Sequence, residues 1–151
     1  MPSIAISTPV GSLTIDAAGD AIVGVRWAND PQGERTPFLA EAARQLDAYF
    51  AGRLSRFDLP LAVSGTAFDQ RVRAAMQAIP YGETRTYGEL AHSTDSGPRA
   101  IGRACGRNSI PIIVPCHRVL ASGGMGGYSG GAGLPTKRWL LDLESRLRKA
   151  A

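Results

Sequence analysis

Apolar and polar residues alternate through the first 28 positions of the chain. "SIAIST" and "GSLTIDAAG" change from apolar to polar at almost every step, and "DAIVGVRWA" is rich in β-branched residues and is bounded by turn residues. A period of two places every second side chain on the same face of a sheet. We therefore predict three short antiparallel strands within residues 3–28.

The segment 37–52 has a helical period instead. Its apolar positions recur at intervals of three and four, and Gly52 ends the pattern, which predicts an amphipathic helix. The apolar positions are Phe38, Leu39, Ala42, Leu46 and Phe50. An extended piece over residues 56–61 follows. We expect these elements to form a small α/β lobe over residues 1–64, with the boundary near Gly65.

Helical patterns dominate residues 65–151. In "GTAFDQRVRAAMQAIPYG", Thr66 and Asp69 have the spacing of a capping box, and the Pro-Tyr-Gly sequence ends the helix. The stripe of this helix consists of Phe68, Val72, Ala75, Met76 and Ile79. The last helix, "TKRWLLDLESRLRKA", carries basic residues in its last turn, where they suit the helix dipole. Its stripe consists of Leu140, Leu141, Leu143 and Leu147.

Two short helices are predicted between these two. "TYGELAHS" forms one, and "GPRAIGRACGRN" forms the other, which begins at Pro98 and ends near Asn108. A short helix, a turn with Gly97 and a second helix that carries arginines make a helix-turn-helix pattern. The fold class is therefore α/β: a small N-terminal α/β lobe of antiparallel strands and a helix, then a mainly helical, winged-helix or helix-turn-helix-like domain over residues 65–151.

Composition narrows the class of protein. The chain has 151 residues, 44% of them apolar, which suffices for one domain or two small lobes. No apolar run approaches the roughly 20 residues that span a bilayer, and no export signal is evident, so we expect a soluble cytoplasmic monomer. The two cysteines and two histidines would all be needed for one zinc site. We expect no metal and no cofactor.

The charge differs between the two halves of the chain. Residues 1–64 carry five Arg against seven Asp or Glu, a net charge of −2, whereas residues 65–151 carry twelve Lys or Arg against six acids, a net charge of +6. Ten of those twelve cations are arginine, the side chain suited to phosphate. A polyanionic partner is one interpretation, and an ordinary solvated basic surface is the other.

The stretch "IVPCHRVL" carries the candidate chemistry. A thiol becomes a strong nucleophile as thiolate, and a neighbouring histidine oriented by a carboxylate can take its proton. Cys116 and His117 fit that arrangement. The alternative is a buried cysteine after a strand "PIIV", with the histidine bonded to backbone. We expect Cys116 to hold more thiolate near pH 6.5 than Cys105, which is interpreted as a small apolar core residue.

"PCHRV" resembles the active-site signature of the O6-alkylguanine-DNA alkyltransferases, also called methylated-DNA–protein-cysteine methyltransferases. "IPYGETRTYGELA", "GPRAIGRACGRN", "IPIIVPCHRV", "GGYSGG" and "KRWLLDLE" follow in the order of that family and span about residues 66–144. The first 64 residues resemble the family only in being a small α/β lobe.

The resemblance implies roles for five residues. Cys116 is the alkyl acceptor, His117 is the base that withdraws its proton, with a water between them, and Glu144 orients the histidine. Asn108 braces the active-site turn, and Tyr87 lies near the guanine. Without the resemblance, Glu144 would be interpreted as a solvated helix residue, Asn108 as a helix C-cap and Tyr87 as a core tyrosine.

The resemblance also implies how the helix-turn-helix meets DNA. Arg99 fills the base stack where the target nucleotide has left, while Gly102 and Ala104 allow close approach to the minor groove. Arg103 and Arg107 follow Arg99 on one helical face, where simple solvation is the alternative reading.

A glycine-rich segment, "GGMGGYSGGAG", lacks the spacing of a nucleotide-binding loop. By resemblance it walls the alkylguanine pocket, for which we assign Val119, Gly127, Tyr128 and Ser129. Ser109 departs from the family, which usually has proline there, and this could loosen Asn108.

The resemblance implies single-turnover repair of double-stranded DNA. The alkylated guanine turns out of the duplex, its alkyl group moves to Cys116, and the resulting thioether has no carbonyl for water to attack. Two alternatives are a cysteine hydrolase, which would turn over repeatedly, and a helix-turn-helix module for damage recognition or regulation without transfer. The range of alkyl groups, activity on O4-alkylthymine and any regulatory role stay open.

Overall fold

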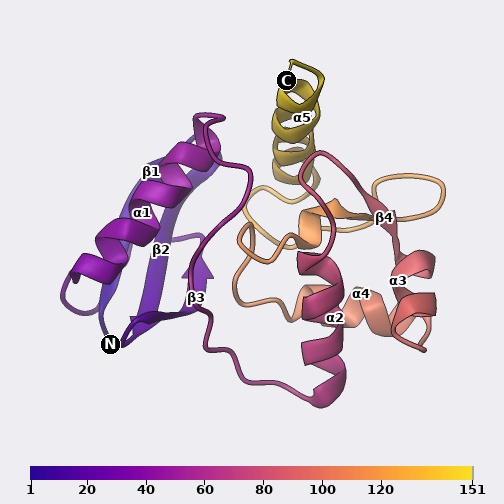
Figure 1. Cartoon of the computed structure of the whole chain (residues 1–151), viewed down its shortest axis with the longest axis horizontal. Coiled ribbons are helices and arrows are strands. Elements are labelled where there is room, and N and C mark those ends of the chain that lie inside the picture. The colour runs from indigo at the N-terminus through magenta and orange to yellow at the C-terminus, as the bar shows by residue number, and fades with distance from the viewer. Residues whose placement is uncertain (151) are drawn as a thin grey trace. The chain divides into compact units, whose positions relative to one another are not determined.

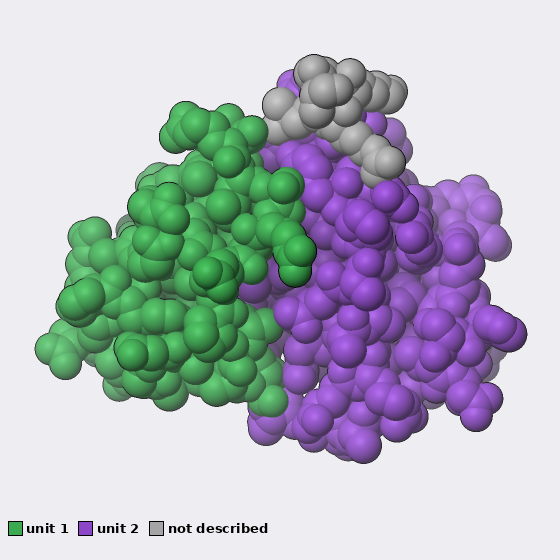
Figure 2. Space-filling model, viewed as in Figure 1, with its two compact units in different colours: residues 1–63 green, residues 64–151 purple. Residues whose placement is uncertain are grey.

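The computed structural model describes the backbone of residues 1–150 and the side chains of residues 1–146. Leu147 and the basic side chains of Arg148 and Lys149, expected in the last helix, lie outside the described side chains. The chain divides into two compact units, Met1–Val63 and Ser64–Ala151, which Figure 2 colours separately. Within the described residues, no helix combines the length and the apolar character needed to cross a bilayer.

Unit 1 is an antiparallel sheet with one helix on it. The strands β1 (Ser3–Thr8), β2 (Gly11–Ala18) and β3 (Ala21–Arg26) pair in the order β1-β2-β3, and α1 (Pro37–Phe50) packs on β1 and β2 (Figure 1). The three predicted strands and the predicted helix are therefore present. A register shift between Asp16 and Ala17 marks a bulge in β2.

The buried face of α1 differs in part from the predicted stripe. Thr36 caps the helix by accepting a hydrogen bond from the Leu39 amide, and Pro37 occupies its first turn. Tyr49 is fully buried, whereas Phe38 and Phe50 are only partly covered. The predicted extended piece makes a single parallel bridge, between Ile22 and Leu61.

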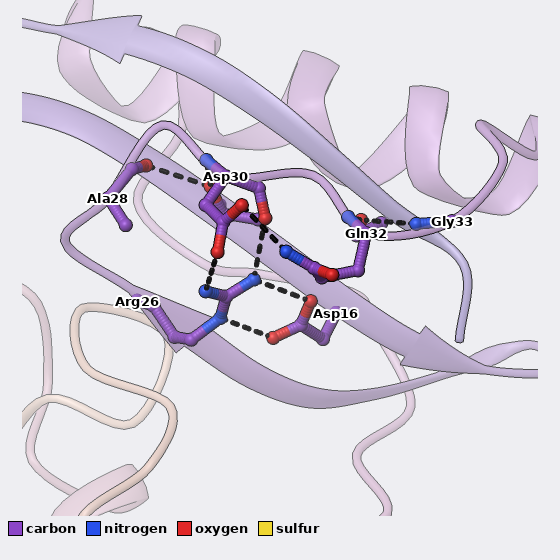
Figure 3. A network of polar contacts seen from close by, with 8 residues as sticks. Asp16, Arg26, Ala28, Asp30, Gln32 and Gly33 are labelled. Atoms are coloured by element: carbon purple, nitrogen blue, oxygen red, sulfur yellow. Dashed lines mark hydrogen bonds and ion pairs between the residues drawn. The ribbon is translucent and has the colours of Figure 1, made fainter.

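The loop after β3 is held to the sheet by side chains (Figure 3). The Arg26 guanidinium donates to both carboxylate oxygens of Asp16, at 2.8 and 3.1 Å, and to the Asp30 carbonyl at 3.0 Å. The Gln32 amide donates to the Asp30 carboxylate at 2.6 Å. The hydroxyl of the buried Ser3 accepts hydrogen bonds from the backbone of Gln32 and Gly33. The loop is therefore ordered without a helix or strand of its own.

Unit 2 contains the helices α2 (Ala67–Gln77), α3 (Tyr87–Ser93), α4 (Pro98–Gly106) and α5 (Leu134–Ala150), and the short 3-10 helix η1 (Cys116–Arg118). The predicted capping box of α2 is present: Thr66 and Asp69 each accept a hydrogen bond from the other's amide. The helices α3 and α4 pack against one another and against α2, and a two-residue strand β4 (Arg85–Thr86) pairs in parallel with β5 (Val119–Leu120). The predicted α/β class is confirmed.

Candidate active site

A tight turn before Cys116 places the thiol. The apolar run 110–114 is not the strand that the alternative reading supposed, because the Ile113 amide donates to the Pro111 carbonyl at 2.9 Å and the Val114 amide donates to the Ile110 carbonyl at 2.9 Å. Ile112 at the bend has φ of 75°, a strained value for a β-branched residue. Its side chain is 1% exposed, so burial in the core holds the bend in place.

Asn108 braces this turn from the end of α4. Its side-chain amide donates to the Val114 carbonyl at 2.9 Å, and its carbonyl oxygen accepts from the Ile110 amide at 3.0 Å. Asn108 also forms a hydrogen bond with the Cys116 thiol. Both backbone bonds form with Ser109 in the next position, so the absence of the usual proline does not release the brace.

His117 and Glu144 meet inside the protein. His117 Nε2 lies 2.7 Å from Glu144 Oε2, and the two side chains are 0% and 1% exposed. A carboxylate at this distance accepts a hydrogen bond from Nε2–H, which leaves Nδ1 as the basic nitrogen of a neutral ring. Nδ1 has no hydrogen-bond partner among the described residues. The histidine is therefore oriented and able to accept one proton.

Arg118 completes this cluster, and the sequence analysis missed it. Its guanidinium donates to Glu144 Oε1 at 2.8 Å and to Oε2 at 3.1 Å, and its third nitrogen donates to the Ile79 carbonyl at 2.8 Å. Burial would raise the pKa of Glu144, but the hydrogen bonds from His117 and Arg118 outweigh it and lower that pKa to about 2. Burial lowers the pKa of His117, against the raising effect of Glu144. The resting pair is a carboxylate and a neutral imidazole.

The Cys116 thiol is protonated in the resting site. Burial raises its pKa, and the hydrogen bond from Asn108 and the charge of Lys137 offset this only in part. The pKa of Cys116 is therefore not lowered by its histidine neighbour in the resting protein, because desolvation penalises the anion more than these groups favour it. That Cys116 holds more thiolate than Cys105 near pH 6.5 stays a prediction. Cys116 differs from a histidine-paired surface thiol, and its proton must leave during the reaction.

Cys105 is also not simply a core residue. Its side chain is partly exposed and lines the same cavity as Cys116, with its thiol against the Met76 sulfur at 3.8 Å. Burial and the neighbouring Cys116 raise the pKa of Cys105 to about 12. Cys105 is therefore a protonated thiol in the wall of the cavity and a weak nucleophile.

The cavity beside Cys116 has a volume of about 600 Å³, within the usual range of ligand sites. It is lined by Tyr87, Pro98, Arg99, Gly102, Cys105, Gly106, Cys116, Gly127, Tyr128 and Ser129. The structure thus brings three of the four predicted pocket residues together with the thiol and with α4. The fourth, Val119, is 0% exposed and is not among the lining residues, and its carbonyl accepts a hydrogen bond from Lys137.

Lys137 holds the glycine-rich loop and is a second residue that the sequence analysis missed. Its ammonium donates to the carbonyls of Val119, Met125 and Gly127 at 2.7, 2.6 and 3.0 Å, and its side chain is 0% exposed. Burial lowers the pKa of Lys137. A signal existed, since Lys137, Leu140 and Glu144 are spaced along one helical face. Two charged residues on an apolar stripe indicate polar partners inside the protein.

Tyr87 fits against the same loop because residue 126 is glycine. A Cβ atom at Gly126 would lie 2.7 Å from the Tyr87 ring and 3.0 Å from its hydroxyl, and φ of 70° there also favours glycine. The Tyr87 hydroxyl forms a hydrogen bond with the Gly127 backbone. Burial raises the pKa of Tyr87, so the phenol keeps its proton and can donate it.

The predicted DNA-facing residues of α4 separate into three groups. Arg99, Gly102 and Arg103 are exposed. Ala104 is 6% exposed and faces the interior, so its assignment to the DNA surface is wrong. Arg107 is exposed but forms an ion pair with Asp69 at 2.6 Å.

Within the described residues, no group of three or more His, Cys, Asp or Glu side chains is placed to hold a metal ion. The absence of a bound metal stays a prediction.

Comparison with known proteins identifies a family. Residues 67–146 match the model described as 6-O-methylguanine DNA methyltransferase, DNA binding domain, and residues 4–63 match the ribonuclease-like domain of the same family. A methylated-DNA–protein-cysteine methyltransferase of Methanosarcina acetivorans is 45% identical over 151 residues, covering 91% of this chain and 94% of the relative. A protein of the same name from Mycobacterium tuberculosis is 44% identical, covering 92% and 89%.

Solved structures agree with these matches. The crystal structure of Mycobacterium tuberculosis O6-methylguanine methyltransferase has a TM-score of 0.85 and 41% identity, and the match covers 96% of this chain and 93% of that one. A crystal structure of the M. tuberculosis protein in complex with DNA has a TM-score of 0.85 and 43% identity, with 95% and 92% covered. The chain therefore belongs to the 6-O-methylguanine-DNA methyltransferase family.

Proposed function

We propose that this protein repairs DNA by direct reversal, moving the alkyl group of O6-alkylguanine in a duplex to Cys116 in a single turnover. One observation carries this function. The cavity that exposes the Cys116 thiol is also lined by Arg99 and Gly102 of α4. A nucleophile and the second helix of a helix-turn-helix therefore share one site, as a protein that reacts with a nucleotide turned out of DNA requires.

The proton of the thiol moves to His117. Cys116 begins protonated, and His117 begins neutral with Nδ1 available, so the proton leaves sulfur for this nitrogen, directly or through one water molecule. The imidazolium that forms is stabilised by the Glu144 carboxylate at 2.7 Å. Arg118 keeps Glu144 ionised, so Glu144 orients and neutralises His117 without taking the proton itself.

Sulfur then attacks the alkyl carbon, and the bond from that carbon to guanine O6 breaks. Tyr87, whose phenol stays protonated, assists the departing purine by a hydrogen bond or proton. The product is a thioether on Cys116 and an unmodified guanine. Water cannot attack a thioether as it attacks a thioester, so each molecule reacts once.

Duplex DNA with an O6-alkylated guanine is the partner. The alkylated atom is out of reach of a buried thiol while the base is stacked, so the nucleotide must turn out. Arg99 fills the space in the base stack that the nucleotide leaves, and Arg103 contacts the phosphate backbone of the DNA. Both side chains are exposed, and among the described residues neither forms an ion pair within the protein. We assign the protein to the cytoplasm, because two free thiols stay reduced in that compartment. We also assign it as a monomer.

The test is an incubation with excess O6-methylguanine duplex, followed by intact and peptide mass. One CH₂ unit should be added to each molecule, on the peptide with Cys116, and Cys116→Ser should abolish transfer while retaining DNA binding. Repeated turnover, or a methyl group on Cys105, contradicts the proposal. Binding of damaged duplex with no transfer by the wild type supports the alternative of a recognition module.

A further inference from the structure

An ion pair joins the end of α4 to the beginning of α2. Arg107 Nη2 lies 2.6 Å from Asp69 Oδ1, and the side chains are 53% and 18% exposed. The two residues are 38 positions apart in the chain, so the pair is a tertiary contact between two helices. Neither residue lines the cavity beside Cys116.

Asp69 uses its two oxygens for different helices. Oδ2 accepts the Thr66 amide at 3.3 Å and completes the capping box of α2, while Oδ1 accepts from Arg107. The hydrogen bond from Arg107 is the first cause of the lowered pKa of Asp69. The capping box of α2 therefore fixes the orientation of the Asp69 carboxylate independently of its contact with Arg107.

Arg107 stands directly before the brace of the active-site turn. It is the C-cap of α4, and its amide donates to the Arg103 and Ala104 carbonyls at 3.1 Å. The next residue, Asn108, holds the turn that leads to Cys116 through the Val114 carbonyl. Fixing the Arg107 side chain to α2 therefore restricts the position of Asn108 relative to the core of the unit.

We infer that Arg107 is a positioning residue for the Cys116 turn, acting through its ion pair with Asp69, and that it is not a phosphate contact. This inference rests on the proposed function. The Asp69 carboxylate at 2.6 Å already offsets the charge of this guanidinium and fixes its direction, so a phosphate gains less from Arg107 than from an arginine without an acidic partner. Arg103, by contrast, is exposed and forms no ion pair among the described residues. The basic residues of α4 therefore have two different roles: Arg107 positions the Cys116 turn, and Arg103 contacts DNA phosphate.

The experiment separates positioning from DNA binding by using a substrate without DNA. Transfer from free O6-benzylguanine to the full chain is measured over a concentration series for Arg107→Gln, Asp69→Asn and the double variant. Each single variant should lower the limiting transfer rate about fivefold, with little change in the substrate concentration for half-maximal rate. The double variant should be no slower than either single one, and Arg107→Lys should recover part of the rate.

Three further measurements make the result decisive. Arg138→Gln, on the exposed face of α5, is the matched control and should keep the wild-type rate. Cys116 should be labelled by iodoacetamide faster in Arg107→Gln than in the wild type, because a looser turn exposes the thiol. The salt dependence of binding to undamaged duplex should be unchanged in Arg107→Gln, whereas Arg103→Gln should reduce its slope by about one.

The opposite pattern overturns the inference. If Arg107→Gln reacts with the free base and with iodoacetamide at wild-type rates but lowers the salt slope by about one, Arg107 is a phosphate contact. Additive effects of the two single variants would show that they do not act as a pair. A wild-type protein that takes no methyl group from O6-methylguanine duplex contradicts the proposed function instead, and the labelling comparison then still decides whether the pair holds the turn.

Discussion

His117 Nε2 and Glu144 Oε2 lie 2.7 Å apart inside the protein, with Arg118 bound to the other side of the same carboxylate. The cluster therefore contains one ionised acid, one permanent cation and one neutral base. Protonation changes the charge of groups that are shielded from solvent, because the side chains of His117 and Glu144 are 0% and 1% exposed. Two consequences follow, one for stability and one for the reactivity of the thiols.

Stability should fall on the acid side in two stages. The pKa of His117 is lowered below its ordinary value of 6.5, so its contribution is complete above pH 6.5 and is lost as the pH falls toward the folded value. The pKa of Glu144 is lowered from 4.5 to about 2, so its contribution is complete above pH 4.5 and is lost between there and about pH 2. Urea unfolding from pH 8 to pH 3 measures this slope.

Glu144→Gln tests the same cluster by mutation. Removing the carboxylate leaves the buried Arg118 without its counter-charge, which should cost about 3 kcal/mol of stability at pH 7. Transfer should slow as well, since His117 loses its orientation. Asp142→Asn, an exposed neighbour on α5, should change stability by less than about 0.5 kcal/mol. Equal effects of the two variants would contradict the role of Glu144.

The two thiols should differ in iodoacetamide labelling at every pH. Burial raises the pKa of both cysteines, to about 12 for Cys105. The charge of Lys137 opposes the rise at both thiols, whereas the hydrogen bond from Asn108 opposes it only at Cys116. Both should therefore be labelled slowly near pH 6.5, and Cys116 should be labelled first as the pH rises. Peptide mass after limiting reagent measures the order. Identical pH profiles, or fast labelling of Cys116 at pH 6.5, would contradict this account.

The sequence predicted the elements of the fold well because their signals are local. The capping box of Thr66 and Asp69, the alternation in residues 3–28 and the Pro98 start of α4 depend on neighbours in the chain, and each is present. The turn at 110–114 was harder to predict from the sequence. Its apolar residues allow a strand, and only the side-chain hydrogen bonds of Asn108 and the burial of Ile112 in the core select the bend.

The prediction included Cys116, His117 and the supporting residues Glu144 and Asn108, but two further supporting residues were missed. Arg118 and Lys137 look like ordinary basic residues, and their burial depends on partners 26 and 18 positions away. Ala104 and Val119 were assigned to surfaces that they do not reach, because a resemblance gives a position and not the direction of a side chain. Nothing in the sequence indicated an acidic partner for Arg107, because Asp69 lies 38 positions away in the chain.

Arg99→Ala should slow transfer from duplex DNA much more than transfer from free O6-benzylguanine. The reason is that the free base needs no flipping, while a duplex loses stacking of a few kcal/mol when the nucleotide turns out. Single-turnover rates on the two substrates measure the difference. An equal loss on both would show that Arg99 shapes the cavity, which it also lines, and does not replace the base.

Gly126→Ala should impair the pocket without abolishing folding. The new methyl group would lie 2.7 Å from the Tyr87 ring, and alanine is strained at φ of 70°. Tyr87 or the loop must move, so transfer from O6-benzylguanine should slow about tenfold. Gly123→Ala, where nothing lies within 4 Å, is the matched control and should react like the wild type. A wild-type rate in Gly126→Ala would show that the loop can move away from Tyr87 without slowing the transfer.

Lys137→Met should release the glycine-rich loop while keeping the volume of the side chain. Three carbonyls, those of Val119, Met125 and Gly127, lose the ammonium that draws them together. Lys137→Arg should not restore the loop, because a planar guanidinium cannot direct its donors to three carbonyls that converge on one atom. Limited proteolysis within residues 121–133 should be faster in both variants, and transfer from O6-benzylguanine should slow about tenfold. Arg138→Met, exposed on the same helix, controls for the loss of a positive charge. If Lys137→Met slowed transfer while the loop resisted proteolysis as in the wild type, the ammonium would act through its charge near Cys116 and not through the loop.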